Sequence, residues 1–187
     1  MIQEEVNKAV EVLRGGGIIL YPTDTVWGIG CDATNAEAVA KIYALKGSVN
    51  KKGMIVLLDK PINVARYVRT VPEIAWDLIE LTDKPLTLIL DGAVGVAPNL
   101  IPEEGSLAIR VADHDFCRRV VGRLGRPLVS TSANFSGEPT PTTFGEIAEG
   151  IKAGVDHIVD LACEGNPTRQ ASSIMILHEN GEFKILR

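Results

Sequence analysis

The segment Ile18-Ile19-Leu20-Tyr21-Pro22-Thr23-Asp24-Thr25 (residues 18–25) places an apolar run directly before a polar one. The apolar half is long enough for a buried strand, and Pro22 ends it because proline cannot donate a sheet hydrogen bond. The hydroxyl and carboxyl groups that follow would lie at the end of that strand, where open α/β sheets bind their ligands. The segment therefore predicts an α/β protein with a polar site at the edge of a sheet.

Helix-like and strand-like patterns alternate along the rest of the chain. Residues 3–14 carry apolar positions at helical spacing, and three glycines follow them. Further strands are expected at 54–58, 86–90, 107–111, 127–131, 172–177 and 182–186, and further helices at 34–45, 72–81 and 113–124. This alternation predicts a twisted sheet of mixed parallel and antiparallel strands, flanked by helices, in a single domain over residues 1–187.

Short-range signals mark the ends of several elements. Thr34 and Glu37 have the spacing of a capping box and would open one helix. Asp113 is expected to cap the helix that follows it. Asn180-Gly181 predicts a tight hairpin between the last two strands, because both residues tolerate the left-handed backbone that such a turn needs.

Composition and charge exclude several classes of protein. Hydrophobic residues make up 45% and charged residues 23%, as in an ordinary globular protein, and no apolar run approaches the ~18 residues of a membrane span. A net charge of −5 argues against a protein that coats nucleic acid. The three cysteines form no CxxC pair, and the N-terminus lacks the pattern of a secretion signal. We therefore expect a cytoplasmic protein that does not contact a membrane.

Four segments carry polar side chains where a ligand could bind. They are residues 21–30 after the first strand, the lysine-rich stretch 46–53, the hydroxyl-rich stretch 128–137, and Arg110 within an apolar strand. Lysines and glycines suit a phosphate-binding loop, and a buried arginine needs an acid or a bound anion. Each pattern also has a structural explanation: a tight turn, a basic surface loop, a serine- and threonine-rich turn, or a structural ion pair.

Other familiar motifs are incomplete or missing. Residues 28–33 match GxGxxA, but the helix is expected to begin only after the motif, which disfavours a dinucleotide-binding fold. The sequence has no GxxxxGK[ST] loop and no GxSxG elbow. His114, His157 and His178 lie far apart, so the sequence predicts no metal site.

Taken in order, the four segments resemble the YrdC-like threonylcarbamoyl-AMP synthase family. The matching pieces are YPTDTVWGIG (21–30), Lys46 with KKGMIVLL (51–58), SLAIRV (106–111) and PLVSTSANFSGEPTPT (127–142), with weaker matches at ASSI (171–174) and ILR (185–187). The match extends from about residue 17 to residue 187. It implies the YrdC-like fold, a twisted mixed sheet around a deep cationic cavity, in the short form with a single domain.

The resemblance also implies a reaction. Members of the family join L-threonine, bicarbonate and ATP into threonylcarbamoyl-AMP and pyrophosphate. Mg²⁺ would enter with ATP, and no tightly bound cofactor is expected. A downstream threonylcarbamoyl transferase complex would then modify adenosine 37 of tRNA, which makes that complex and tRNA candidate partners. The substrate supplies the nucleophile, so the protein would contribute positioning and charge neutralisation.

The resemblance assigns roles to particular residues. L-Threonine would be bound by Thr23, Arg110, Thr131, Ser172 and Ser173. The nucleotide would be bound by Lys46, Asn50, Ser132, Asn134, Thr140 and Arg187. Lys46 would also be the catalytic residue, and no metal ligand is implied.

The chain departs from the family at the lysine loop. The family usually reads Lys-x-Arg there, whereas this chain has Lys46-Gly47-Ser48. Serine cannot make the planar two-point contact of arginine with a phosphate, and Lys51 or Lys52 is expected to compensate. Two alternatives stay open. One is a YrdC-fold paralogue acting as an RNA- or nucleotide-binding translation or ribosome-maturation factor. The other is a carbamoyl-phosphate-using relative of the hydrogenase-maturation type.

Overall fold

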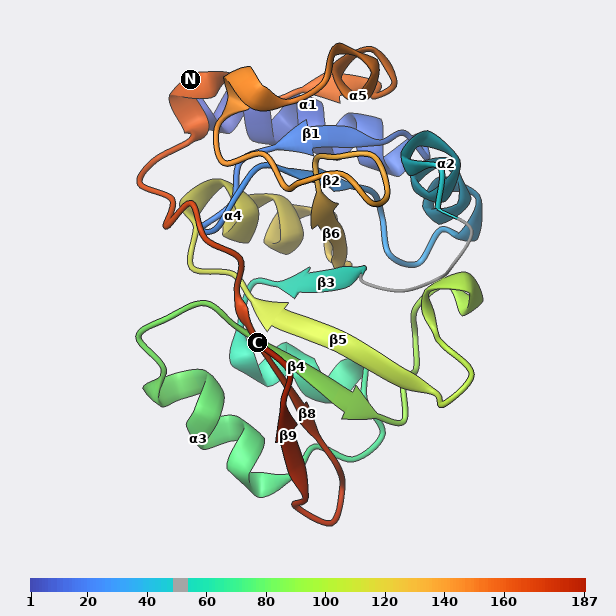
Figure 1. Cartoon of the computed structure of the whole chain (residues 1–187), viewed down its shortest axis with the longest axis vertical. Coiled ribbons are helices and arrows are strands. Elements are labelled where there is room, and N and C mark those ends of the chain that lie inside the picture. Colours follow the sequence, from blue (N-terminus) through green and yellow to red (C-terminus); the bar gives the residue numbers. More distant parts are fainter. Residues whose placement is uncertain (49–53) are drawn as a thin grey trace.

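The computed structural model describes residues 1–48 and 54–187, and an open mixed sheet of nine strands runs through this part of the chain (Figure 1). The strand order is β7-β1-β2-β6-β3-β5-β4-β8-β9. The strands are β1 (Ile19–Tyr21), β2 (Gly28–Gly30), β3 (Ile55–Leu58), β4 (Leu86–Asp91), β5 (Ser106–Val111), β6 (Leu128–Ser132), β7 (His157–Ile158), β8 (Ser173–Leu177) and β9 (Phe183–Ile185). Parallel pairs, such as β3 with β5, occur beside antiparallel pairs, such as β3 with β6, so the predicted mixed sheet is confirmed.

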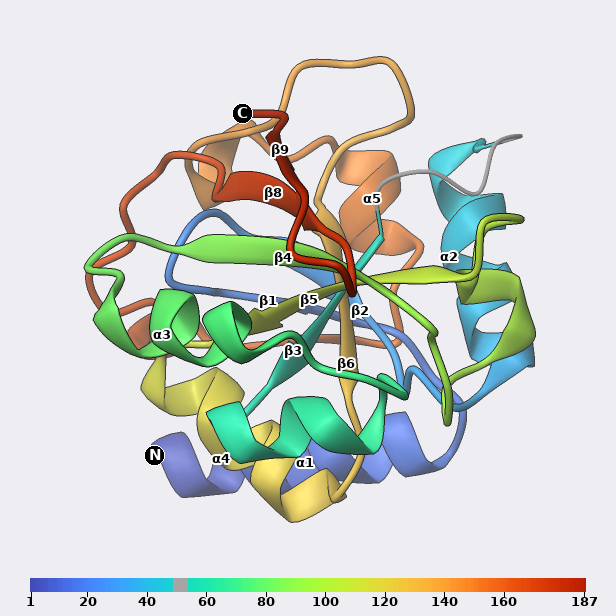
Figure 2. The same cartoon turned by 90° about the horizontal axis from the view of Figure 1, so that it is seen from below.

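Helices flank the sheet at several places. The α-helices are α1 (Ile2–Arg14), α2 (Ala36–Lys46), α3 (Glu73–Leu81), α4 (Asp115–Leu124) and α5 (Glu149–Ala153), and the 3-10 helices are η1 (Pro61–Arg66), η2 (Pro98–Leu100), η3 (Phe144–Glu146) and η4 (Leu161–Cys163). In Figure 2, α1, α4, η1 and α3 lie in the lower half of the view, whereas β8 and β9 lie in the upper half. Helices α2 and α5 lie in the upper half of the same view, so helices flank the sheet from both directions.

Two apolar clusters form the core. One joins α1 and α4 to the sheet and includes the fully buried Leu13, Tyr21, Leu57 and Phe116. The other contains most of the remaining buried apolar residues from β2, β3, β4, β5 and β6 and from α2. Burying apolar side chains on both sides of a sheet is what holds helices against strands in an α/β layer.

Two predicted helix caps are wrong. Thr34 does not cap α2, because its N–H and hydroxyl both donate to Asp32 Oδ1, at 2.8 and 2.7 Å. Asn35 is the N-cap instead, and its side chain accepts from the backbone N–H groups of residues 37 and 38. Helix α4 likewise begins after His114, since the Asp113 carboxylate pairs with Arg118 at 2.9 Å. In both cases the residue predicted to cap the helix interacts with another side chain instead of with the free backbone N–H groups of the first helical turn.

Strand β2 was not predicted. Its sequence is Gly-Ile-Gly, which has little intrinsic preference for a strand. It forms because β1 and β6 pair with it on both sides. A Cβ atom on Gly30 would lie 2.6 Å from Tyr21 Cε1, so only glycine fits there. The first three residues of GxGxxA form strand β2, and the next helix begins only at Ala36, so the segment lacks the strand–turn–helix arrangement of a dinucleotide-binding motif, as the sequence indicated.

The remaining local predictions agree with the structure. The strand runs, the N-terminal helix and the helix at 73–81 occur where the apolar periodicity places them. Gly181 has a φ of 86° and closes the predicted hairpin between β8 and β9. Within the described ranges, every helix is too short or too polar to cross a lipid bilayer.

Candidate functional site

A network of buried hydroxyl groups follows strand β1 and surrounds one guanidinium. Thr23 Oγ1 lies 2.9 Å from Thr25 Oγ1 and donates to the carbonyl of Val26 at 2.7 Å. Arg110 Nη1, from the middle of β5, donates to Thr25 Oγ1 at 3.0 Å. The two threonines are 1% and 4% exposed. The polar residues after the first strand and the arginine of the fourth predicted segment therefore form one site.

Arg110 is only partly satisfied in this network. Its Nη2 lies 3.2 Å from Asp24 Oδ1, which makes an ion pair by distance, but its buried Nε has no hydrogen-bond partner within the described residues. The residue is 4% exposed. A buried guanidinium with a free donor is costly unless an anion reaches it. The arrangement is suited to a carboxylate ligand.

Residues from the C-terminal half extend the same face of the sheet. Leu88 pairs with Ile109, so Thr87 and Arg110, which precede and follow them, share the opposite face. Thr87 Oγ1 lies 2.8 Å from Ser172 Oγ, and both residues are buried. The Ser172 carbonyl accepts from Arg187 Nε at 3.0 Å. Ser172 thus lies near the arginine network, whereas Ser173 is exposed at the start of β8.

A second cation lies at the end of helix α2. Lys46 is 8% exposed, and Nζ donates to the carbonyls of Ser132 and Asn134, the latter at 2.7 Å. Gly47, with a φ of 66°, ends the helix immediately afterwards and leaves Lys46 in the last turn. Burial lowers the pKa of Lys46 from 10.5 to about 8, because desolvation disfavours the ammonium. A bound anion would compensate the Lys46 ammonium for the hydration that it loses on burial.

Strand β6 connects the lysine with the arginine network. Leu57 pairs with both Leu128 and Arg110, so strand alternation puts Ser130 and Ser132 on the face of Arg110. Gly28 pairs with Ser132, and a Cβ atom on Gly28 would lie 3.2 Å from Ser130 Oγ and 3.7 Å from Thr23 Cγ2. Arg110, Ser130 and Ser132 therefore lie on one face of the sheet, and Lys46 contacts the backbone at the end of β6, the strand that carries the two serines.

The structure does not bring all the predicted residues together. Thr131 pairs with the core residue Ile29, so its side chain points to the opposite face from Ser130 and Ser132. Thr140 is exposed in the loop after β6. Asn134 donates to the carbonyls of Phe135 and Glu138, and its buried Oδ1 has no partner within the described part of the chain. Asn50 lies outside the described residues.

Three hydroxyl residues of the site were not predicted. They are Thr25, Thr87 and Ser130. For Ser130 the alternation of strand β6 was a usable signal, since it shares a face with Ser132. Thr25 belongs to the quoted segment 18–25 but had no stated role. Nothing in the local sequence of Thr87 distinguishes it from a core threonine.

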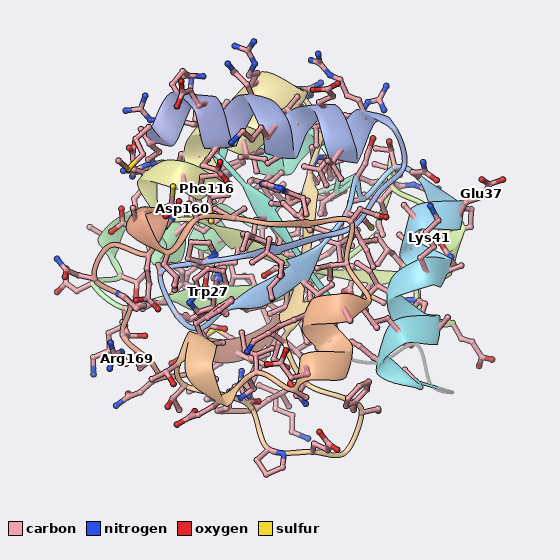
Figure 3. All side chains as sticks on the ribbon, turned by 90° about the horizontal axis from the view of Figure 1, so that it is seen from above. Trp27, Glu37, Lys41, Phe116, Asp160 and Arg169 are labelled. Atoms are coloured by element: carbon pink, nitrogen blue, oxygen red, sulfur yellow. The ribbon has the colours of Figure 1, made fainter. Side chains whose placement is uncertain are left out.

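The segment after η4 covers the hydroxyl network. The backbone N–H groups of Thr168 and Arg169 donate to the carbonyls of Asp24 and Thr25, both at 2.9 Å. Figure 3 shows Trp27 and Arg169 on the same side of the molecule, and the Trp27 indole donates to Glu164 Oε1 at 2.7 Å. These contacts keep Thr23 and Thr25 away from water.

A cavity of about 380 Å³ lies on the other face of strands β4 and β5. Ile109 and Val111 line it, so Arg110, between them, points away from it. Four carboxylates and two cations are on its walls, which does not suit a triphosphate. The deep cationic cavity implied by the resemblance stays a prediction.

Comparison with known proteins finds one family model and several similarly named relatives that match most of the chain. The family model Sua5_yciO_yrdC, described as "Telomere recombination", matches residues 11–187. Threonylcarbamoyl-AMP synthase of Halorhodospira halophila is 33% identical over 155 residues, covering 82% of this chain and 81% of that protein. The synthase of Photobacterium profundum is 31% identical over 191 residues, covering 94% of this chain and 99% of that protein.

Solved structures give the same fold. Sua5 of P. abyssi, crystallised with L-threonine, has a TM-score of 0.86 and 27% identity, and the match covers 97% of this chain. The match covers 53% of that protein, so this chain spans about half its length. E. coli YciO has a TM-score of 0.81 and 23% identity, with 99% of this chain and 89% of that chain covered, and it supports the fold alone.

Proposed function

This chain belongs to the Sua5/YciO/YrdC family, and we propose that it is a threonylcarbamoyl-AMP synthase that uses L-threonine, bicarbonate and ATP. The observation that carries the proposal is the buried Arg110, set among hydroxyl groups with its Nε free, while Lys46 contacts the end of strand β6, whose Ser130 and Ser132 share the face of Arg110. One cation suits a carboxylate and the other suits a phosphate.

The reaction needs no nucleophile from the protein. The amine of L-threonine combines with CO₂ from bicarbonate and loses a proton, which gives a carbamate. A carbamate oxygen attacks the α-phosphorus of ATP, the bond to the bridging oxygen breaks, and pyrophosphate leaves. The product is the mixed anhydride threonylcarbamoyl-AMP. The protein's task is to align two anions and neutralise their charge.

The arginine network would bind the amino acid. The free Nε of Arg110 can donate to the threonine carboxylate, and the hydroxyl groups of Thr23 and Ser172 can bind the polar atoms beside it. The resemblance also assigned Thr131 and Ser173 to this ligand. In this structure Thr131 points to the face of the sheet opposite Arg110, and Ser173 is exposed on the surface. Burial makes each charge-assisted contact stronger than it would be in water.

The lysine end would bind the nucleotide. Lys46 Nζ already lies against two carbonyl groups and is largely desolvated, so a phosphate oxygen would stabilise its charged form. Ser132 and Asn134 are within the same cluster. Asn50, Thr140 and Arg187 remain proposals for the nucleotide as well. Mg²⁺ would arrive with ATP as part of the substrate, coordinated mainly by phosphate oxygens.

The experiment is to incubate the purified protein with MgATP, L-threonine and bicarbonate and to detect the product by mass spectrometry. We expect a mixed anhydride that disappears when bicarbonate or threonine is omitted, together with pyrophosphate release. Failure to form it under conditions in which the H. halophila protein does so would contradict the proposal.

The alternative of an RNA-binding factor is less well supported. The curated relatives named above are synthases, and the net charge is −5. Binding of tRNA that is strong at low salt and unaffected by ATP and threonine would favour that alternative. Transfer of the labile product to a downstream transferase complex, contact with tRNA and a cytoplasmic location are further parts of the proposal.

A further inference from the structure

Thr87 places a hydroxyl group in an otherwise apolar part of the sheet. It belongs to strand β4, whose sequence is Leu-Thr-Leu-Ile-Leu-Asp, and its side chain is fully buried. Valine has the same shape and would avoid the cost of taking a hydroxyl group out of water. The Thr87 hydroxyl therefore needs a partner that offsets this cost.

That partner is Ser172, which immediately precedes strand β8. Thr87 Oγ1 lies 2.8 Å from Ser172 Oγ, and both residues are buried. The backbone around Ser172 is also held in place. The N–H of Ser173 donates to the carbonyl of Pro85 at 3.0 Å, and the carbonyl of Ser172 accepts from Arg187 Nε. The contact with Thr87 thus fixes the rotation of the Ser172 side chain, which the backbone bonds leave free.

The two hydroxyl groups lie beside the arginine network. Leu88 pairs with Ile109 in the antiparallel register of β4 with β5, so Thr87 is opposite Arg110 on the face of the sheet that the proposed reaction uses. Side chains opposite each other in such a pair have Cβ atoms about 4.5–5.5 Å apart. An anion bound to the free Nε of Arg110 would therefore lie close to the Thr87–Ser172 pair.

The hydrogen bond between the two hydroxyl groups leaves one proton available. Two hydroxyl groups have two protons, and their mutual bond uses one of them. Within the described residues, Ser172 is the partner that the Thr87 hydroxyl contacts. When Thr87 donates to Ser172 Oγ, the proton of Ser172 is free for a second acceptor. A carboxylate held by Arg110 is an acceptor of this kind, and its charge strengthens the bond.

We propose that Thr87 is a positioning residue for L-threonine, which holds the Ser172 hydroxyl in the orientation that donates to the amino acid bound at Arg110. This inference rests on the proposed function, because it adds a residue to the same amino-acid site. Thr87 acts through Ser172 and does not touch the substrate. Without the Thr87 hydroxyl, the Ser172 side chain would sample several orientations, and binding would have to select one of them.

Isothermal titration calorimetry with L-threonine alone tests this role. Thr87→Val keeps the shape of the side chain but removes the hydroxyl, and it should raise the Kd for L-threonine about three- to tenfold. Thr87→Ser keeps the hydroxyl and should remain within about twofold of the wild type. The matched control is Thr82→Val, at an exposed threonine whose hydroxyl donates to the Lys84 carbonyl, and it should not change the Kd.

Two calorimetric results would overturn the inference. One is an unchanged Kd in Thr87→Val. The other is an equal loss of affinity in Thr87→Ser and Thr87→Val, since the methyl group and not the hydroxyl would then be what matters.

A double-mutant cycle shows whether Thr87 acts through Ser172. Ser172→Ala removes the hydroxyl that Thr87 holds, so adding Thr87→Val to it should weaken L-threonine binding by no more than about twofold further. If the added loss is as large as the loss in Thr87→Val alone, the two side chains act independently and the inference is wrong.

Steady-state kinetics separates a misplaced hydroxyl from a displaced segment. The Ser172 carbonyl accepts from Arg187, a proposed nucleotide residue, so movement of the whole segment would raise the KM for ATP as well. Thr87→Val should raise the KM for L-threonine and change the KM for ATP by less than about twofold. Equal rises in the two constants would overturn the inference.

The same assays distinguish failure of this inference from failure of the proposed function. Wild-type protein that binds L-threonine but forms no threonylcarbamoyl-AMP would contradict the synthase proposal, and the calorimetric comparison would still decide the role of Thr87. Product formation by the wild type, with an unchanged threonine KM in Thr87→Val, would overturn the role of Thr87 alone.

Discussion

Arg110 Nη1 donates a hydrogen bond to Thr25 Oγ1 over 3.0 Å, although the two residues are 85 positions apart in the chain. The same threonine oxygen lies 2.9 Å from the hydroxyl of Thr23. Thr25 therefore orients the guanidinium while leaving Nε free, and we regard it as a positioning residue for the arginine that would bind the substrate carboxylate.

Removing the Thr25 hydroxyl should weaken threonine binding. In Thr25→Val the side chain keeps its shape but loses its contact with Arg110, and the KM for L-threonine should rise about tenfold with a smaller effect on the KM for ATP. Steady-state kinetics of pyrophosphate release measure both constants. Thr70→Val, at an exposed threonine, is the matched control, and equal KM values in the two variants would contradict the role of Thr25.

Lys46 should be the most costly single loss at the nucleotide end. Lys46→Ala removes a buried ammonium next to Ser132 and Asn134 and should reduce kcat/KM for ATP at least about tenfold, since a charge-assisted contact contributes ~1.5–3 kcal/mol. Lys41→Ala changes an exposed lysine on the same helix, visible in Figure 3, and should leave the rate unchanged. Intact pyrophosphate release in Lys46→Ala would exclude this assignment.

The lowered pKa of Lys46 predicts a pH dependence of stability. Burial lowers this pKa to about 8 in the folded protein, against the ordinary lysine value of 10.5 that the unfolded chain regains. Between these values the unfolded chain binds more protons, so this lysine's contribution to the free energy of unfolding increases as pH rises from about 8 to 10.5.

Urea unfolding at several pH values can isolate that contribution. The free energy of unfolding of the wild type, minus that of Lys46→Met, should increase with pH across this window, by at most about 3 kcal/mol. The subtraction removes the effect of the buried tyrosines and cysteines, whose raised pKa values act in the opposite direction. A difference that does not change with pH would show that Lys46 keeps its ordinary pKa.

Gly30 should tolerate no side chain. In Gly30→Ala the new methyl group would meet the Tyr21 ring and the Val129 carbonyl inside the sheet, and the free energy of unfolding should fall by about 1–3 kcal/mol. Chemical denaturation measures the change. Gly145→Ala is the control, because a Cβ atom there meets nothing within 4 Å, and equal losses in both variants would contradict close packing at Gly30.

The serine at position 48 leads to a prediction from sequence alone. If Lys51 or Lys52 replaces the missing arginine, the double variant Lys51→Ala/Lys52→Ala should raise the KM for ATP by about tenfold. Both lysines lie outside the described residues. An unchanged KM would exclude compensation by these lysines, and Ser48→Arg provides the complementary gain-of-contact variant.

Elements with a strong local pattern could be predicted from the sequence. The strand at 19–21 is a run of apolar residues before a proline, and the last hairpin follows from Asn180-Gly181. Strand β2 could not be predicted, because its glycines acquire a strand conformation only through pairing with β1 and β6. The cap of α2 was misplaced by one residue because Asp32 competes for Thr34.

The sequence by itself determined the class of fold and the chemical types in the site, since apolar periodicity and the motifs around Thr23, Lys46, Arg110 and Ser132 are local properties of the chain. Only the tertiary structure decided which of them meet. Arg110 contacts Thr25 because β5, β3, β6, β2 and β1 pair in that order, and Lys46 contacts residue 132 because α2 ends beside β6. The register of that pairing also turned Ser130 toward the site and Thr131 away from it, because successive side chains on a strand point to opposite faces.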